Sequence, residues 1–341
     1  MQNFISKKSI FLAGFLVLTL ILSWEFYLRH RGIEADFDDN AELWANKRAM
    51  VYEPSDKATV FIGSSRIKYD LDIPTWEKST GNHAVQLATV GSSPRLILSN
   101  LAKDQKFKGR LVVDITEILF FSLNPKFTKR PSDGIEFYKK RTPAQLASNF
   151  FGSPLQSSFV FLNEEFFSLN ALLARFHLKD RVGILPPMDF PFGFGLTQSN
   201  RQTKMSANFV ADTNLQNRVK AVWYGLSKAN PTPPIKGKSL DSLIQTVRMD
   251  VDKIRARGGK VIFIRTPSSG PFLMGENIGY PRNLYWEKLL LVTNCKGVYF
   301  ADYPATAHFQ CPEFSHLKPQ DAILYTQNLI QILGSENGWK L

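Results

Sequence analysis

Five short apolar segments, separated by stretches with helical spacing, set the hydrophobic pattern of the chain. The segments are 58–62, 83–88, 110–115, 261–265 and 297–300. Each segment is almost continuously apolar, which is typical of strands covered on both faces of a sheet. Strands and helices alternate along the chain, an order that favours right-handed crossovers and parallel pairing. We therefore expect an α/β domain, a three-layer sandwich around a mostly parallel five-stranded sheet.

Helices are expected where apolar residues recur at intervals of three and four positions. Ser93 and Pro94 are typical of a helix start, and the Gly258-Gly259 pair is typical of a helix end. The expected helices lie around 41–50, within 70–81, from 93–94 onward, and over 240–254, 284–292 and 319–333.

The alternation of strands and helices is interrupted between residues 120 and 238. This stretch contains paired phenylalanines and several prolines, including a Pro-Phe-Gly-Phe-Gly run. We interpret 120–238 as a long, partly helical insertion that forms a lid or a second lobe. The α/β domain then consists of 58–119 and 239–341, and 32–57 forms a linker.

The N-terminal segment, 1–31, is predicted to be a membrane anchor. Residues 10–24 carry no charge, and the wider stretch 9–28 reaches the roughly 20 residues that a transmembrane helix needs. No small-x-small cleavage site follows, which favours a retained anchor over a cleaved signal peptide. Lys7 and Lys8 predict a cytoplasmic N-terminus, with the rest of the chain on the extracytoplasmic side. Basic residues after the apolar run oppose this orientation.

Composition adds further bounds on partners and chemistry. The 341 residues are 44% hydrophobic, which is enough for one large core or two smaller ones. The 42 basic and 30 acidic residues give a net charge of +12, which favours anionic partners such as lipid headgroups or acidic glycans. No basic run is interleaved with aromatic residues, so we do not expect binding to nucleic acid.

The two cysteines, Cys295 and Cys311, have two interpretations. Outside the cytoplasm they are candidates for one disulfide, and otherwise they are two buried thiols. No cluster of cysteines and histidines has the spacing of metal ligands, so we expect neither a metal nor another cofactor.

Gly63-Ser64-Ser65, directly after the first apolar segment, is the strongest candidate for chemistry. A turn there presents a hydroxyl at the carboxyl edge of the sheet, where α/β proteins bind ligands. A serine nucleophile also needs a base within hydrogen-bond reach and an acid that orients the base. Taken alone, such a turn is more often only a turn.

His308 and His316 are the candidate bases, because the loop after the last strand opens at the same edge. His316 is favoured, since Glu313 stands three residues earlier and can hold the tautomer of the ring. The other histidines are less suitable as the base, because His30 is expected at the membrane face, His83 on a strand and His177 in the insertion.

Gly63-Ser64-Ser65, Gly91 after the second strand and Glu313-x-x-His316 before the last helix together resemble the SGNH (GDSL-like) hydrolase superfamily. The resemblance covers about 58–118 and 239–334. Within the superfamily the chain is most similar to the membrane-anchored branch associated with membrane-bound O-acyltransferases, of the teichoic acid D-alanine transfer and alginate acetylation type. The resemblance implies the SGNH/flavodoxin-like form of the α/β sandwich.

The resemblance also implies a role for each of these residues. Ser65 is the nucleophile, His316 the base and Glu313 the orienting acid. The backbone N–H groups of Ser65 and Gly91 are oxyanion donors, aimed at the charge that develops on the acyl carbonyl.

The chain departs from the family pattern at three positions. The orienting acid is Glu313 instead of an aspartate, and Asp302 is a rival for that role. Ser64 replaces the aspartate of Gly-Asp-Ser, as in the anchored branch. The third-block asparagine is not evident, and Thr116 or Asn124 could supply the missing oxyanion donor.

The resemblance implies a serine-dependent O-acyltransferase or esterase that adds or removes an acyl group, acetyl above all, on a cell-surface polysaccharide. Its partners are the glycan or polymer, the membrane and a membrane-bound O-acyltransferase, and its catalytic domain is periplasmic. The alternative is a non-catalytic accessory protein of the same fold that binds a glycan or the acyltransferase. A third interpretation, a turn that cradles a phosphate, is disfavoured because the Walker lysine pattern is missing.

Overall fold

The computed structural model of the chain describes residues 6–53, 58–174, 189–229, 233–335 and 338–339. The chain folds into two compact units. One unit consists of Met1–Asp38 with Pro143–Pro186, and the other of Asp39–Thr142 with Pro187–Leu341. The predicted insertion, 120–238, is therefore shared between the two units.

The larger unit is built on a five-stranded sheet in which all neighbours pair in parallel, in the order β2-β1-β3-β6-β7. The strands are β1 (Ala58–Ile62), β2 (His83–Gln86), β3 (Arg110–Asp114), β6 (Lys260–Arg265) and β7 (Gly297–Tyr299). The prediction of an α/β fold with a parallel five-stranded sheet is confirmed, and each strand begins and ends within two residues of its predicted bounds.

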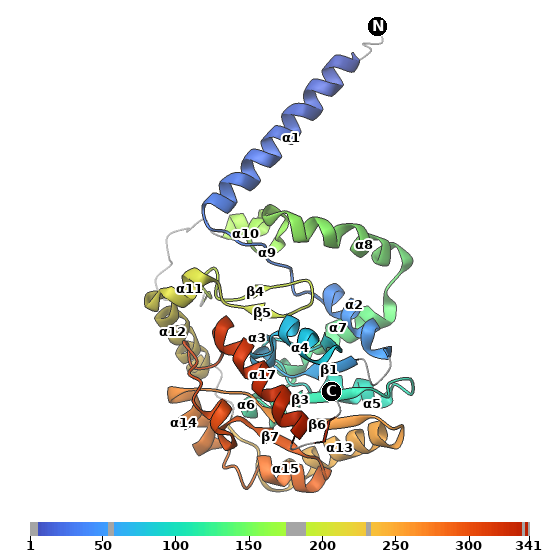
Figure 1. Cartoon of the computed structure of the whole chain (residues 1–341), viewed down its shortest axis with the longest axis vertical. Coiled ribbons are helices and arrows are strands. Elements are labelled where there is room, and N and C mark those ends of the chain that lie inside the picture. The colour runs from blue at the N-terminus through green and yellow to red at the C-terminus, as the bar shows by residue number, and fades with distance from the viewer. Residues whose placement is uncertain (1–5, 54–57, 175–188, 230–232, 336–337, 340–341) are drawn as a thin grey trace. The chain divides into compact units, whose positions relative to one another are not determined.

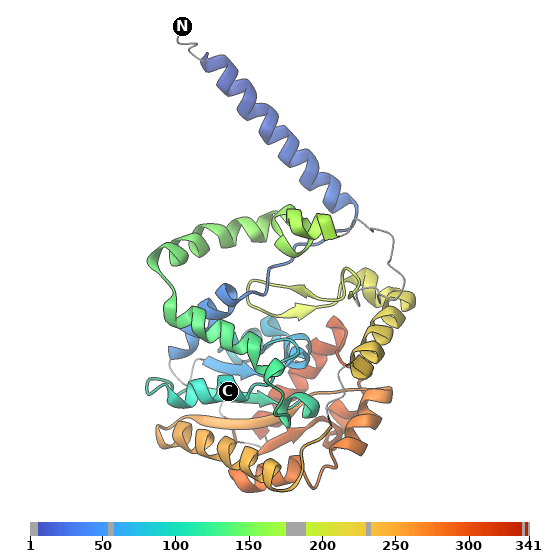
Figure 2. The same cartoon turned by 180° about the vertical axis from the view of Figure 1, so that it is seen from behind.

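Two groups of helices pack against this sheet. In one group α13 (Gly237–Ala256) contacts α5 (Arg95–Lys103) and α15 (Trp286–Thr293), and in the other α17 (Pro319–Ser335) contacts α3 (Ser65–Asp70) and α4 (Ile73–Thr80). Figure 1 looks onto the side of α17, and Figure 2 looks onto the side of α5 and α13. The sheet is thus covered on both faces, as its apolar strands require.

The other described elements of the larger unit are mostly short. They are α2 (Ala41–Ala49), η1 (Met50–Tyr52), α6 (Glu117–Phe120), η2 (Pro125–Thr128), α7 (Lys129–Lys140), β4 (Leu196–Thr197), β5 (Thr203–Lys204), α11 (Ala207–Ala211), α12 (Thr213–Ala229), α14 (Gly270–Gly279), η4 (Phe300–Asp302) and α16 (Pro304–Ala307). One sequence-based expectation needs correction: Pro94 is the cap of α5 and not its first residue. The Gly- and Pro-containing stretch after β6, for which there is no sequence-based expectation, forms the helix α14.

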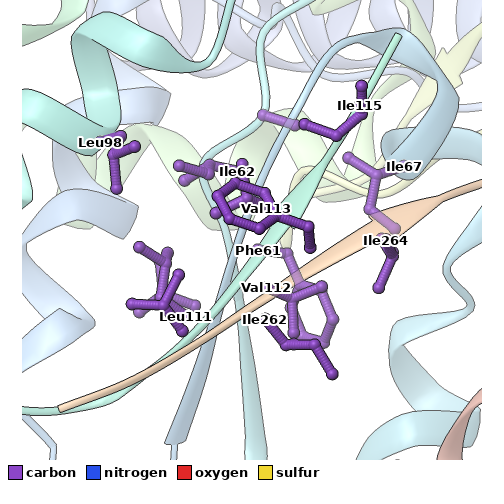
Figure 3. Packing of buried hydrophobic residues seen from close by; sticks show 14 of the residues in the cluster. Phe61, Ile62, Ile67, Leu98, Leu111, Val112, Val113, Ile115, Ile262 and Ile264 are labelled. Carbon is purple, nitrogen blue, oxygen red and sulfur yellow. The ribbon is translucent and has the colours of Figure 1, made fainter. Parts of the chain in front are cut away.

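The core lies between the sheet and its helices. Figure 3 shows Phe61, Val113 and Ile262, from three neighbouring strands, packed among the side chains of the same cluster. All five residues of β1 and all five of β3 are buried. Because these strands are fixed on both faces, the loops at their carboxyl ends start from defined positions.

The smaller unit contains the N-terminal helix α1 (Lys7–His30), a second helix of 16 residues and three short elements. These are α8 (Pro143–Ser158), η3 (Val160–Leu162), α9 (Glu164–Phe167) and α10 (Leu169–Ala174). With 24 residues, α1 is about 36 Å long at 1.5 Å per residue, which exceeds a hydrocarbon thickness of about 30 Å. Among the described helices, α1 is long and apolar enough to cross a membrane, a test that signal sequences also pass.

Candidate active site

The predicted serine turn lies at the carboxyl end of β1. Ser64 caps α3, and its Oγ accepts a hydrogen bond from the N–H of Arg66 at 3.4 Å. Ser65 is the first residue of the helix and is half-buried, so its hydroxyl lies at the edge of the sheet. A Cβ on Gly63 would lie 2.6 Å from Cγ2 of Ile67 and 2.8 Å from Cβ of Asp114. Glycine is therefore required where strand turns into helix.

His316 lies in the loop between α16 and α17, at the same edge. The N–H of Leu317 donates to Oδ1 of Asp70 at 2.9 Å, which ties the loop to the end of α3. Phe314 has φ of +81°, a conformation that is strained for a bulky residue. Its carbonyl accepts from the N–H of Ser269 at 2.9 Å. The strained residue is thus held from the neighbouring loop after β6.

Ser65, His316 and Glu313 form one continuous hydrogen-bonded chain. Nδ1 of His316 lies 2.9 Å from Oε1 of Glu313, and Nε2 lies 2.8 Å from Oγ of Ser65. A carboxylate only accepts, so Nδ1 carries the ring proton and Nε2 is left to accept the proton of the Ser65 hydroxyl. These distances fall within the range in which a general base acts on a nucleophile.

Glu313 is fully buried and accepts four hydrogen bonds. Its Oε1 receives the Nδ1–H of His316 and the backbone N–H groups of His316 and Ser315, at 2.6 and 3.3 Å. Its Oε2 receives the indole N–H of Trp223 at 2.5 Å. The longer side chain of glutamate therefore reaches the imidazole by folding back over its own loop. Trp223 was not among the residues predicted from the sequence, because no short-range pattern connects α12 with this loop.

Aromatic side chains surround the imidazole of His316. The ring centroid of Tyr69 lies 4.2 Å from that of His316, and those of Phe194 and Trp223 lie at 5.7 and 6.1 Å. Phe194 and Trp223 belong to the part of the predicted insertion that lies in the larger unit. This part of the insertion lines the site, and its apolar rings exclude water from one side of the imidazole.

The predicted oxyanion donors lie on the loops that follow β1, β2 and β3. As the first residue of α3, Ser65 has an N–H without an intrahelical acceptor. Gly91 is exposed with φ of +62°, and a Cβ built on it would meet open space. The N–H of Thr89 donates to the carbonyl of Gly63 at 3.2 Å, which extends the pairing of β1 and β2 toward both turns.

Thr116 forms a hydrogen bond with Ser64, the neighbour of the candidate nucleophile Ser65. Its Oγ1 lies 2.6 Å from Oγ of Ser64. One of the two hydroxyl protons fills this bond, so the other proton stays available for a further acceptor. Asn124, the rival of Thr116 for this role, accepts instead from the N–H of Lys126 at 3.0 Å and caps η2.

The structure does not bring the alternative acid or the alternative base into the hydrogen-bonded chain. Asp302 is exposed and pairs with Arg282 at 2.5 Å. His308 is exposed, and its Nδ1–H donates to the carbonyl of Pro304 at 3.1 Å. Of the remaining histidines, His30 ends α1 and His83 begins β2, while His177 lies outside the described residues.

The disulfide interpretation of Cys295 and Cys311 is wrong, since both thiols are free and buried. Cys295 precedes β7, whereas Cys311 follows it, with Sγ 3.7 Å from the carbonyl of Pro267 beyond the end of β6. Cys295 thus lies at the amino end of these parallel strands and Cys311 at their carboxyl end, which is incompatible with disulfide geometry. Burial raises the pKa of both thiols, so they resist ionisation.

A buried ionic cluster lies directly behind the site. The guanidinium groups of Arg66 and Arg265 both bond to the carboxylate of Glu276, and Arg265 also bonds to Glu117 at 3.1 Å. Nε of Arg66 donates to Oγ of Ser315 at 3.4 Å. Two positive and two negative groups balance within this cluster. It connects the residue after Ser65 with the residue before His316.

Two buried carboxyl groups lie beside the candidate residues. Burial raises the pKa of Asp114 to about 6, although Arg66 and the hydrogen bonds from Thr266 oppose the shift. Burial also raises the pKa of Asp70 well above its usual range, despite the hydrogen bond from Leu317. Burial therefore shifts both groups toward the neutral form, although a pKa of about 6 leaves Asp114 mostly ionised at neutral pH.

Within the described ranges, no group of three or more histidine, cysteine, aspartate or glutamate residues has the arrangement of a metal site. The chain was also compared with known proteins, and neither a protein-family model nor a curated protein sequence matches it.

Proposed function

We propose that this protein is an SGNH-type serine O-acyltransferase or esterase, anchored by α1 with its larger unit on the extracytoplasmic (periplasmic) side. One observation carries the proposal. Oγ of Ser65 lies 2.8 Å from Nε2 of His316, whose Nδ1 lies 2.9 Å from the buried carboxylate of Glu313. The substrate is an O-acyl group, acetyl above all, on a cell-surface polysaccharide, and a membrane-bound O-acyltransferase is its partner.

The reaction proceeds in two steps on these residues. Oγ of Ser65 attacks the acyl carbonyl carbon, and its proton passes to Nε2 of His316. Glu313 stabilises the imidazolium, and the N–H groups of Ser65 and Gly91 with a hydroxyl of the Ser64–Thr116 pair stabilise the oxyanion. The imidazolium then protonates the leaving alcohol, which leaves an acyl ester on Ser65.

The second step returns the enzyme to its first state. The hydroxyl of a sugar acceptor, or water, attacks the acyl ester and gives its proton to His316. As the intermediate collapses, the bond between the acyl carbon and Oγ of Ser65 breaks and His316 returns the proton to Oγ. This step releases a new ester, or a carboxylic acid in the case of water, and restores the hydroxyl of Ser65. The two outcomes use the same residues, so the acceptor decides between transfer and hydrolysis.

The test uses the full chain in lipid nanodiscs with a fluorophosphonate probe and a small chromogenic acetate ester. We expect the probe to label Ser65, as located by peptide mass spectrometry, and Ser65→Ala to lower ester turnover by about 10⁴-fold or more. Ser79→Ala, at an exposed position of α4, is the control and keeps probe labelling. Absence of labelling in a folded wild-type chain would contradict the proposal.

The non-catalytic alternative gives a different result in cells. If the protein only docks on a glycan or an acyltransferase, cells that carry Ser65→Ala keep the wild-type level of polysaccharide O-acylation. The proposed enzyme requires this level to change, because the acyl ester on Ser65 cannot form.

A further inference from the structure

Helix α8 has the reverse of the usual distribution of polar and apolar residues. Its large apolar side chains are exposed, with exposed fractions of 44% for Leu146, 72% for Phe150, 69% for Phe151 and 51% for Leu155. The half-buried positions follow one helical stripe and are polar or glycine: Gln145, Asn149, Gly152, Ser153 and Gln156. A surface helix of a soluble protein turns its apolar side inward. The outward apolar face of α8 therefore needs a partner.

The composition of α8 indicates what kind of partner this is. Its 16 residues include no charged side chain. Large apolar side chains are also exposed on α10, where the exposed fractions of Leu169, Leu172 and Leu173 are 71%, 43% and 55%. Exposed apolar side chains in such number mark an interaction site, and a face without charged side chains can enter the acyl chains without the cost of desolvating a charge.

Hydrogen bonds tie the C-terminal end of α8 to the end of α1. Arg29 donates to the carbonyl of Ser158 at 2.9 Å. The buried carboxylate of Glu25 accepts from the N–H groups of Val160 and Phe161, at 3.0 and 3.4 Å. Glu25 directly follows the uncharged stretch 10–24, so it stands where α1 leaves the hydrocarbon. The end of α8 is thereby held at the level of the membrane surface.

Both views of the chain show α8 running off to the side from the foot of α1 and not along it (Figures 1 and 2). A helix that starts at the membrane surface and runs across a spanning helix lies along the bilayer plane. We propose that α8 is an interfacial helix, with Leu146, Phe150, Phe151 and Leu155 inserted among the lipid headgroups and upper acyl chains. This inference rests on the proposed anchoring of α1.

The test measures the depth of single positions in the full chain. Phe150→Cys is labelled with an environment-sensitive fluorophore, and the protein is reconstituted into vesicles of equal parts phosphatidylcholine and phosphatidylglycerol. The native cysteines are buried, and an unmutated chain taken through the same labelling corrects for them. Quenching by nitroxide-labelled lipid and by aqueous iodide is then compared. Leu155→Cys is a second position, should Phe150→Cys fail to fold.

Three matched positions separate the possible results. Gln156→Cys lies on the polar stripe of the same helix, Lys238→Cys is an exposed position of the larger unit, and Leu20→Cys reports on α1. We expect lipid nitroxide to quench the label at position 150 several-fold more than the label at 156. Iodide should quench the label at 150 several-fold less than the label at 238.

Iodide quenching at position 150 equal to that at 238, without quenching by lipid nitroxide, would overturn the proposal. Protection of position 150 from both quenchers would also overturn it, because a protein partner and not lipid would then cover α8. If the label at position 20 is quenched by lipid while that at 150 is not, only the inference about α8 fails. If neither label is quenched by lipid, the proposed anchoring fails as well.

Discussion

Replacing Trp223 by phenylalanine should weaken the candidate site without removing any of its three central residues. In the described part of the chain, the indole N–H of Trp223 is the donor to Oε2 of Glu313, whereas the other three donors reach Oε1. The phenylalanine ring keeps the aromatic packing but leaves Oε2 of a fully buried carboxylate without a partner. The substitution thus isolates one hydrogen bond to a charged group.

The size of the effect follows from that bond. A hydrogen bond to a charged group contributes about 1.5–3 kcal/mol, and a factor of ten in rate corresponds to about 1.4 kcal/mol. We therefore expect kcat/KM for the acetate ester to fall about 10- to 100-fold, mainly through kcat, because Glu313 acts by orienting His316. The free energy of unfolding should decrease by about 1.5–3 kcal/mol. The assays are ester hydrolysis in nanodiscs and urea unfolding followed by fluorescence.

Two variants control for packing in this region. Phe190, whose ring centroid lies 4.9 Å from that of Trp223, has no bond to Glu313, so Phe190→Leu should change kcat/KM within about twofold. Trp223→Gln restores a side-chain N–H donor and should recover part of the loss. Wild-type kcat/KM in Trp223→Phe would refute the reasoning, and so would an equal loss in Phe190→Leu.

Four further predictions concern the surroundings of Ser65. Glu313→Gln removes the carboxylate that fixes the proton on Nδ1 of His316, so kcat should fall about 10⁴-fold and the probe should label Ser65 more slowly. A loss in kcat below tenfold would exclude this role. Gly63→Ala places a Cβ 2.6 Å from a side-chain carbon, so stability should fall by about 1–3 kcal/mol in urea unfolding, and an unchanged midpoint would contradict this. Asp70→Ala removes the acceptor for the loop of His316 and should slow probe labelling, whereas Asp70→Asn keeps an oxygen there and should label faster than Asp70→Ala. The folded-state pKa of Asp114, about 6, exceeds the ordinary 3.8, so the contribution of this shift to the free energy of unfolding is present below pH 4 and is lost as pH rises through 6. The total contribution is at most about 3 kcal/mol. Asp114→Asn should flatten this part of the profile of stability against pH.

The parallel sheet could be predicted from the sequence because its strands are buried on both faces. In β1 and β3 every position is apolar or buried, and such runs stand out from the amphipathic helices between them. The meeting of Ser65 with His316 follows from the same topology, since Ser65 begins the helix after β1 and His316 lies on the loop after β7, both beyond the carboxyl ends of parallel strands. This general property of parallel sheets predicts that the two residues, although far apart in the chain, lie at the same end of the strands.

The contacts that surround these residues could not be predicted in the same way. The bond from Trp223 to Glu313 depends on how α12 packs against the loop of His316, where Lys220 also lies over the ring of Phe314 at 5.0 Å. In the segment interpreted as a polar linker, Asp39 pairs with Lys68 and with Arg201, the latter at 2.7 Å. Contacts of this kind depend on packing between distant elements and leave no periodic signal along the chain.

The separation of the two halves of the candidate site along the chain bears on how the protein is made. Ser65 and His316 are 251 positions apart, and their hydrogen bond requires the sheet and the loop before α17 to be in place. A polypeptide released before this loop is synthesised would carry the serine without its imidazole, and so without the base that the proposed mechanism requires. If the proposed function is right, incomplete or misfolded copies are not expected to cleave esters, because the site is assembled only when folding is nearly finished.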